Sequence, residues 1–426
     1  MEKRFYSQIN ESIYEYDHTS GLHVQIIPKE GYNKKFAILT VDFGSVDTEF
    51  ILPGEKDVTT VPGGIAHFLE HKLFEQKNVD VLEQFARLGA QANAATSFSR
   101  TYYYFTATEN FEECFDLLLY FVFHPYLTKE NVEKEKGIIS QEINMYLDNP
   151  YFISSMNLQR AIYHNNPIRN DIAGSCQDVM SIDVDTLKTV YESFYVPSNM
   201  SLVVVGDISC DAIVLSVDKA FKNKKKTVVP CRVPWNEPKE IKESFIEEKM
   251  EVAMTIFNIG FKDDNEKFTG VKRVRRDIAG MILANMLFGQ TSEFYEKMYN
   301  KGIINQSFYS GYEIERDFAL FTIGGESEHV DELVDEIKKY IKDLDEKGLD
   351  EDDFIMIKNS TEGEMIKAFN SPETIGKIFG RLHLQGINGF DYFLSCGTID
   401  FQEVVDVFRS VLLGDMAVSI VSKREE

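Results

Sequence analysis

The chain has 426 residues, of which 43% are hydrophobic, and a formal net charge of -24 at pH 7. This length exceeds what one ordinary hydrophobic core fills, so we expect about two to three domains in a folded, non-fibrous protein. The strong negative charge argues against nonspecific binding to nucleic acid or to an anionic membrane, because such binding needs a basic surface. Charge alone names no substrate, since acidity could favour basic peptides but also keeps a protein in solution.

The cysteines indicate neither disulfides nor a thiolate metal site. There are five of them, they lie far apart, and no two form a C-x-x-C pair. Such usage is typical of reduced thiols in a cytosolic protein. Residues 1–7 contain no apolar signal-peptide segment, and no run approaches the roughly 18 apolar residues of a membrane helix. We therefore expect a cytoplasmic protein.

The first predicted elements are two strands at residues 23–29 and 36–43, which flank a turn at residues 30–33. A polar loop that ends in Pro62-Gly63-Gly64 follows them. The loop leads into an apolar helix that begins just beyond the glycine pair and extends to residue 74.

This helix carries His67, Glu70 and His71 within a sector of about 100°. Two histidines one turn apart can both reach a tetrahedral Zn²⁺ at about 2.0 to 2.1 Å. Glu70 is not needed as a ligand and can take a proton from a water molecule whose pKa the ion lowers toward about 7. A third protein ligand is still required.

The alternative is an ordinary amphipathic helix whose buried histidines are hydrogen-bonded. The chain contains only 8 histidines. Two of them flanking a glutamate at this spacing arise by chance in roughly one such chain in a hundred, so we favour the metal site.

Residues 79–88 are predicted as a short helix that ends at Gly89. Residues 91–97 and 101–108 are predicted as two strands joined by a polar turn. The first of these strands has small side chains and follows the metal motif, so it could accept an extended peptide by edge pairing. An ordinary inner strand fits the same pattern equally well.

Residues 111–123 are predicted as a helix that stops before Pro125, because proline disfavours helix in the residue before it. A longer helix follows at residues 128–147. Glu135 and Glu142 lie within about 20° on one face of it. Isoleucines beside them indicate a partly buried face, and a buried carboxylate needs a cation. Glu142 is our candidate for the third zinc ligand and Glu135 for a supporting partner; the alternative is two solvated carboxylates.

Residues 229–245 contain several prolines, follow a run of lysines and are predicted as a linker. The second half is predicted to begin with one long strand at residues 250–261. The other predicted elements are helices at residues 152–164, 184–194, 271–288, 292–301, 328–347, 350–370, 372–385 and 401–412, a helix that ends at residue 221, and strands at residues 200–205, 307–313, 319–324 and 416–421.

The two halves carry a weak internal repeat. Residues 199–205 resemble residues 415–421, and residues 67–74 align with residues 281–288. In the second copy, the two imidazoles and the carboxylate are replaced by Met281, Ala284 and Asn285. If the repeat is real, the fold was kept and the metal chemistry was lost.

The repeat predicts a division of the chain into two homologous domains. We expect a zinc-binding catalytic domain at residues 1–228, a linker at residues 229–245, and a second homologous domain without metal ligands at residues 246–426.

Several segments of the sequence resemble the inverted-motif (HxxEH) zinc peptidases of the pitrilysin and insulinase type, which include mitochondrial processing peptidase. The likeness covers the first 230 residues well and the rest loosely, and it is greatest to the bacterial subgroup of short, two-domain chains. The matching segments are residues 67–71 (His-Phe-Leu-Glu-His), 89–96, 135–142, 197–200 and 205–207.

The resemblance implies one Zn²⁺ per chain with His67, His71 and Glu142 as ligands. It also implies Glu70 as general base and Glu135 as the outer carboxylate that supports the site.

The fold that the resemblance implies is α+β, with two homologous domains, each a mostly antiparallel sheet packed by helices, arranged as a clamshell. In such enzymes the peptide is added in extended form to an edge strand inside. Asn93 and Ala94 match positions that lie along the bound peptide.

One departure from the family concerns the second domain. Many relatives carry an Arg and a Tyr there that grip the substrate. Here Tyr299 stands near the Arg position, and Asn305 or Gln306 near the Tyr position, so neither gripping residue is present. In relatives of this size two chains can divide the labour, which predicts a dimer, with a heterodimer slightly preferred to a homodimer.

Together these observations predict a zinc endopeptidase that acts on short or unfolded peptides within a two-domain chamber, with neither nucleic acid nor membrane as a partner. The alternative is a peptide-binding or scaffolding subunit of a peptidase complex, in which the metal is structural or idle. The complete ligand set favours catalysis, and the missing Arg and Tyr favour the alternative.

Overall fold

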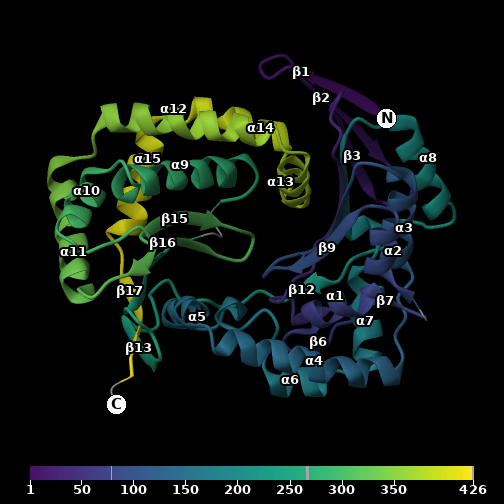
Figure 1. Ribbon diagram of the computed structural model, residues 1–426, viewed down its shortest axis with the longest axis horizontal. Coiled ribbons are helices and arrows are strands. Elements are labelled where there is room, and N and C mark those ends of the chain that lie inside the picture. Colours follow the sequence, from purple (N-terminus) through teal and green to yellow (C-terminus); the bar gives the residue numbers. More distant parts are fainter. Residues whose placement is uncertain (78, 265–267, 425–426) are drawn as a thin grey trace. The chain divides into compact units, whose positions relative to one another are not determined.

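The computed structural model describes residues 1–77, 79–264 and 268–424. The chain forms two compact units, each with one main β-sheet packed by helices (Figure 1). The predicted α+β class with two domains is confirmed. The first unit consists of Met1–Ile143, Asp171–Pro234 and Ile366–Phe390, and the second of Asn144–Asn170, Trp235–Met365 and Asp391–Glu426.

The main sheet of the first unit has the strand order β1-β2-β3-β11-β4-β10-β9. Its neighbouring strands are antiparallel except β3 and β11, which are parallel. Strand β9 lies at one edge, so the alternative of an ordinary inner strand is wrong. The strands are β1 (Glu2–Tyr6), β2 (Glu11–Asp17), β3 (His23–Pro28), β4 (Lys35–Val41), β9 (Gln91–Thr96), β10 (Thr101–Ala107) and β11 (Met200–Gly206).

The N-terminal hairpin of β1 and β2 was not predicted. The exposed side chains of β1 give no alternating apolar pattern, so nothing in that stretch marked a strand. The shorter strands of this unit are β5 (Glu49–Ile51), β6 (Val58–Thr60), β7 (Glu75–Gln76), β8 (Val79–Asp80) and β12 (Cys231–Arg232).

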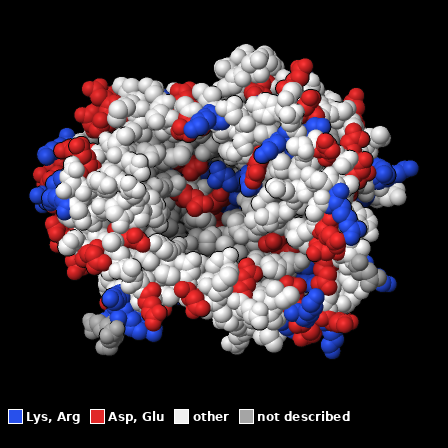
Figure 2. Space-filling view, in the orientation of Figure 1, with Lys and Arg blue, Asp and Glu red and all other residues white. Residues whose placement is uncertain are grey.

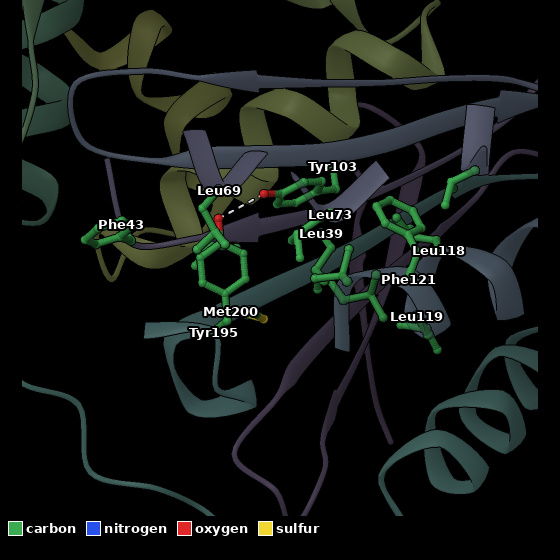
Figure 3. Packing of buried hydrophobic residues seen from close by; sticks show 14 of the residues in the cluster. Leu39, Phe43, Leu69, Leu73, Tyr103, Leu118, Leu119, Phe121, Tyr195 and Met200 are labelled. Carbon is green, nitrogen blue, oxygen red and sulfur yellow. Dashed lines mark hydrogen bonds between the residues drawn. The ribbon is translucent and has the colours of Figure 1, made fainter. Parts of the chain in front are cut away.

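The helices that pack on this sheet bury one apolar face each. Figure 3 shows Leu69 and Leu73 of α1, Tyr103 of β10 and Phe121 of α3 meeting in this core. The helices are α1 (Ile65–Phe74), α2 (Val81–Arg87), α3 (Phe111–Phe123), α4 (Lys129–Leu147, whose last turn belongs to the second unit), α6 (Cys176–Ser181), α7 (Val184–Phe194), α8 (Cys210–Phe221) and the 3₁₀ turn η2 (Pro197–Asn199).

The sheet of the second unit has the order β13-β17-β14-β16-β15. Only β13 and β17 are parallel in it, which reproduces the order and directions of β3-β11-β4-β10-β9. This agreement supports the internal repeat. The strands are β13 (Phe245–Met250), β14 (Ile256–Lys262), β15 (Tyr309–Ile314), β16 (Ala319–Glu326) and β17 (Met416–Lys423).

The single long strand predicted at residues 250–261 is wrong. The chain forms β13 and β14 instead, and these pair with opposite sides of β17. Because the chain has to cross from one side of β17 to the other, residues 251–255 cannot continue a strand.

The helices of the second unit agree closely with the predicted ranges. Two differences are α14, which was not predicted, and the stretch at 401–412, where the α-helix ends at Val407 and one π-helical turn follows. The helices are α5 (Pro150–Ile162), α9 (Val271–Phe288), α10 (Glu293–Asn300), α11 (Val330–Lys347), α12 (Glu351–Ala368), α14 (Gly389–Ser395), α15 (Phe401–Val407), the π-helical turn η5 (Phe408–Leu412) and the 3₁₀ turns η1 (Pro167–Arg169) and η4 (Cys396–Thr398).

Each sheet is covered on one face by a helix from the other half of the sequence. Helix α13 (Pro372–Leu384) packs on β4 and β11 of the first unit, and α5 packs on β14 and β17 of the second. The compact units therefore depart from the contiguous ranges 1–228 and 246–426 at these two helical segments. The predicted domain limits elsewhere, and the clamshell arrangement, stay predictions.

Glycines allow the close approach of α13 to its sheet. A Cβ atom at Gly376 would lie 2.5 Å from the ring of Phe36, and one at Gly380 would lie 2.6 Å from Oγ1 of Thr40. Both distances are shorter than van der Waals contact, so the helix depends on the absence of side chains at these two positions.

The charge distribution on the surface and the apolar content of the helices bear on whether nucleic acid or a membrane could be a partner. On the face shown in Figure 2, acidic and basic side chains are interspersed with uncharged surface, and no continuous basic patch is seen there. Among the described residues, no helix combines the length and the apolar composition that crossing a membrane requires.

Candidate metal centre

Helix α1 begins at a position that only glycine fits. Gly64 has a positive φ of 78°, and a Cβ atom there would lie 2.0 Å from the carbonyl oxygen of Ala173. From this start the helix buries Phe68, Leu69 and Leu73, the last two of which are labelled in Figure 3. The 3.6-residue repeat then leaves His67, Glu70 and His71 together on the half-buried face.

Helix α4 brings Glu142 to the two histidines. One ligand atom each of His67, His71 and Glu142 lies within 4.8 Å of the others. Nε2 of His67 is 3.8 Å from Oε1 of Glu142, and Nε2 of His71 is 3.5 Å from Oε2. Ligands around a tetrahedral Zn²⁺ at about 2.0 to 2.1 Å lie about 3.3 Å apart, so small movements adapt this set to the ion. Two imidazoles and a carboxylate leave the fourth position open.

Glu135 holds His71 from the side away from Glu142. Oε1 of Glu135 is 3.1 Å from Nδ1 of His71. Because an ionised carboxylate only accepts hydrogen bonds, Nδ1 carries the proton, and Nε2 is the nitrogen that can bind a metal. Burial raises the pKa of Glu135, but the hydrogen bond from His71 and the charge of Lys72 outweigh it and leave that pKa below its ordinary value.

The two histidines differ in their surroundings. Burial, with a smaller contribution from His71, lowers the pKa of His67 to about 4. Burial also acts to lower the pKa of His71, but the neighbouring carboxylates, above all Glu135, raise it above its ordinary value. Nδ1 of His67 is buried and has no hydrogen-bond partner among the described residues. The neutral His67 and the carboxylate-rich setting of His71 both suit a bound cation.

Glu70 lies beside the three ligand atoms and is not one of them. Its Oε2 accepts a hydrogen bond from Oγ1 of Thr96, at the end of β9, over 2.9 Å. Burial raises the pKa of Glu70, and Glu142 adds to this, while His71 and Thr96 oppose it. A carboxylate with a raised pKa holds a proton more firmly than a free carboxylate does, which suits a general base.

The predicted site residues fall into two groups. His67, Glu70, His71, Glu135 and Glu142 come together in the first unit as described above. Asn93 and Ala94 lie on the edge strand β9, which packs against α1. Oδ1 of Asn93 accepts the hydrogen bond of the Ala94 amide over 2.8 Å.

Two residues of this site were not singled out in the sequence. Thr96 lies inside the matching segment at residues 89–96, but nothing in its spacing indicated a contact with Glu70. Lys72 follows His71 and lies in the otherwise apolar face of the helix beside Leu69, which is a detectable signal because lysine is rarely buried.

A model described as Insulinase (Peptidase family M16) matches residues 59–175, and one described as Peptidase M16 inactive domain matches residues 181–361. The uncharacterized zinc protease YmfH of Bacillus subtilis (strain 168) is 36% identical over 414 residues, which are 96% of this chain and 96% of that protein.

Two further comparisons extend this result. The beta subunit of mitochondrial-processing peptidase from Caenorhabditis elegans is 27% identical over 204 residues, 44% of each chain. The crystal structure of an M16-like peptidase from Alicyclobacillus acidocaldarius has a TM-score of 0.93 at 32% identity and covers 97% of this chain and 99% of that one. Because YmfH matches the chain almost from end to end at more than one residue in three, the protein belongs to the insulinase family of peptidases, M16.

Proposed function

We propose that the protein is a zinc metalloendopeptidase that cleaves short or unfolded peptides. In this proposal one Zn²⁺ is held by His67, His71 and Glu142, and Glu70 is the general base. The observation that carries the proposal is the convergence of three ligand atoms within 4.8 Å, with a fourth side chain of raised pKa next to them. Metal-ligating and proton-accepting groups are rarely gathered in one partly buried place without a chemical use.

Zinc held there would polarise the scissile carbonyl group and make a water molecule easier to deprotonate. Glu70 accepts the proton of the attacking water on a carboxylate oxygen and passes it to the leaving amine nitrogen. The hydrogen bond from Thr96 to Oε2 limits the rotation of this carboxylate, so Oε1 remains available for the proton. Glu135 keeps His71 in the tautomer that presents Nε2.

The edge strand β9 supports an extended peptide as substrate. Its six residues include three alanines, and their small side chains leave the backbone accessible for pairing with a peptide. The Ala94 amide donates a hydrogen bond to the side chain of Asn93, and in this proposal a carbonyl of a bound peptide takes over that hydrogen bond. In this proposal Asn93 and Ala94 line the bound peptide. Enclosure of the peptide in a two-domain chamber stays a prediction.

A second candidate is a subunit with little activity of its own that needs a related partner. The feature that favours it lies in the second unit, where the resemblance puts Tyr299 near the position of the gripping Arg and Asn305 or Gln306 near that of the gripping Tyr. Tyr299 is 45% exposed, and the amide of Asn305 is bonded to the sulfur of Met254. A heterodimer in which the partner supplies both residues would complete the enzyme. The cytoplasmic location also stays a prediction.

The test is hydrolysis of a mixed pool of unfolded peptides by the purified chain, with metal content measured on the same samples and Glu70→Gln as the matched variant. The proposed enzyme binds about one zinc and cleaves the peptides. The variant binds zinc, but its rate of cleavage falls by a factor of about 10² to 10⁴. If both proteins hold zinc and neither cleaves, the partner-dependent subunit is the better description. A wild-type chain without zinc contradicts both.

A further inference from the structure

Lys72, the residue after His71 in α1, is completely buried, with 0% of its surface exposed. Lysine is almost never buried to this extent unless it is paired, because moving an ammonium group out of water is costly. Its ammonium group bonds to the carboxylate of Glu75, and Nζ lies 3.3 Å from Oε2 of Glu135. Lys72 is thus in contact with the carboxylate that orients one of the candidate metal ligands.

The two oxygen atoms of Glu135 are divided between two donors. Oε1 faces Nδ1 of His71 at 3.1 Å, and Oε2 faces the ammonium group of Lys72. The last torsion of a glutamate side chain is otherwise soft, so a carboxylate with a single donor can turn. With a donor on each oxygen the carboxylate of Glu135 cannot turn without losing one of them.

The second copy of the repeat separates packing from charge at this position. In the alignment of residues 67–74 with 281–288, Lys72 corresponds to Met286, which is 6% exposed on α9. Both helices therefore bury a long, unbranched side chain here. The charge is present only in the copy that has the histidines, so the fold of the helix does not require it.

We propose that Lys72 is a positioning residue of the metal centre. By holding Oε2 of Glu135, it keeps Oε1 on Nδ1 of His71 and so directs Nε2 of His71 toward the metal. The proposal rests on the metal site of the proposed function. It gives a role in zinc affinity to a residue that touches neither the metal nor the substrate.

The test measures zinc affinity by competition with a chromogenic chelator at constant pH, and the stability of the metal-free protein by urea unfolding. The variants are Lys72→Met, which copies Met286, Glu135→Gln, and the double variant. Lys136→Met is the matched control, because Lys136 is also a buried lysine but is paired with Glu133 instead. Should Lys72→Met not fold, Lys72→Gln serves as the neutral variant.

We expect Lys72→Met to weaken zinc binding about tenfold, within the range for groups that orient ligands. Lys136→Met should stay within about twofold of the wild type. If Lys72 acts through Glu135, adding Lys72→Met to Glu135→Gln should change the affinity by less than about twofold.

Two results overturn the role of Lys72 alone: a wild type that binds zinc no more tightly than Lys72→Met, or a double variant that loses a further tenfold beyond Glu135→Gln. A wild-type chain that binds no zinc at all overturns the proposed function and this inference together, and it is recognised before any variant is made.

Discussion

Helix α1 of the first unit and helix α9 of the second occupy equivalent places in their own sheets. Helix α1 packs on β9 and β10, and α9 packs on the corresponding strands β15 and β16. Both helices bury their apolar face. They differ where α1 has His67, Glu70 and His71 and α9 has Met281, Ala284 and Asn285.

This difference indicates that a unit of this fold can form without the three ionisable side chains. The same helix forms on the same pair of strands with and without the three ionisable side chains. In α1 these side chains are partly buried, which is a cost that α9 avoids. A costly cluster that the fold does not need points to selection for chemistry.

The largest expected effect comes from giving α1 the residues of α9. The triple variant His67→Met, Glu70→Ala and His71→Asn should lose zinc binding by at least about a thousandfold, because two of three protein ligands are gone. The metal-free variant should be at least as stable as the metal-free wild type, because the substitutions remove three partly buried ionisable side chains whose desolvation costs free energy. Zinc titration and urea unfolding measure the two quantities. Loss of folding would show that the metal residues are also needed for the fold.

The next prediction concerns α13, the helix from the second half of the sequence that packs on the sheet of the first unit. His383 stacks on His23 of β3 with ring centroids 3.8 Å apart, and Asp17 lies 2.6 Å from the His23 ring. Burial, aided by His23 and opposed by Asp17, lowers the pKa of His383 from 6.5 to about 4. Between these values the unfolded chain binds the proton more readily, so stability falls as the pH falls, by at most about 3 kcal/mol.

His383→Phe should remove this dependence and keep the stacked ring. Urea unfolding of both proteins at several pH values between 8 and 4 should give curves that diverge below pH 6.5. Parallel curves throughout would contradict the link between His383 and acid stability.

A smaller effect is expected at the glycines that let α13 approach its sheet. Gly376→Ala would place a Cβ atom 2.5 Å from the ring of Phe36 and should lower the free energy of unfolding by about 1 to 3 kcal/mol. Gly363→Ala is the control, because a Cβ atom on α12 there meets nothing within 4 Å. The control should be stabilised by about 0.5 to 1 kcal/mol. If both substitutions lowered the free energy of unfolding, or both raised it, the result would argue against this packing.

The smallest effect concerns Thr96 of β9, whose hydroxyl group donates a hydrogen bond to Glu70. Thr96→Val keeps the shape but removes the hydrogen bond to Oε2 of Glu70. We expect kcat to fall about tenfold with zinc content unchanged, which matches the usual value of one hydrogen bond to a charged group. Thr96→Ser should retain most of the rate. If the kcat of Thr96→Val equalled that of the wild type, Glu70 would not need the hydrogen bond from Thr96.

Local spacing along the chain determined much of this protein. The position of α1, its two histidines one turn apart and the carboxylate between them follow from the 3.6-residue repeat. The same repeat put Glu135 and Glu142 on one face of α4. Apolar periodicity also predicted most helices of the second unit, since each buries a single stripe.

Only the tertiary structure decided which distant segments meet. The contact of Glu135 with His71 joins residues 64 positions apart, and that of Thr96 with Glu70 joins residues 26 positions apart. Strand pairing between such segments decides that β9 lies at an edge and that the predicted long strand breaks between β13 and β14. Helix packing between them decides that α5 and α13 each cover the sheet of the other half of the sequence. Local patterns do not contain this information, because a strand or helix with one apolar face fits several partners equally well until the whole core is packed.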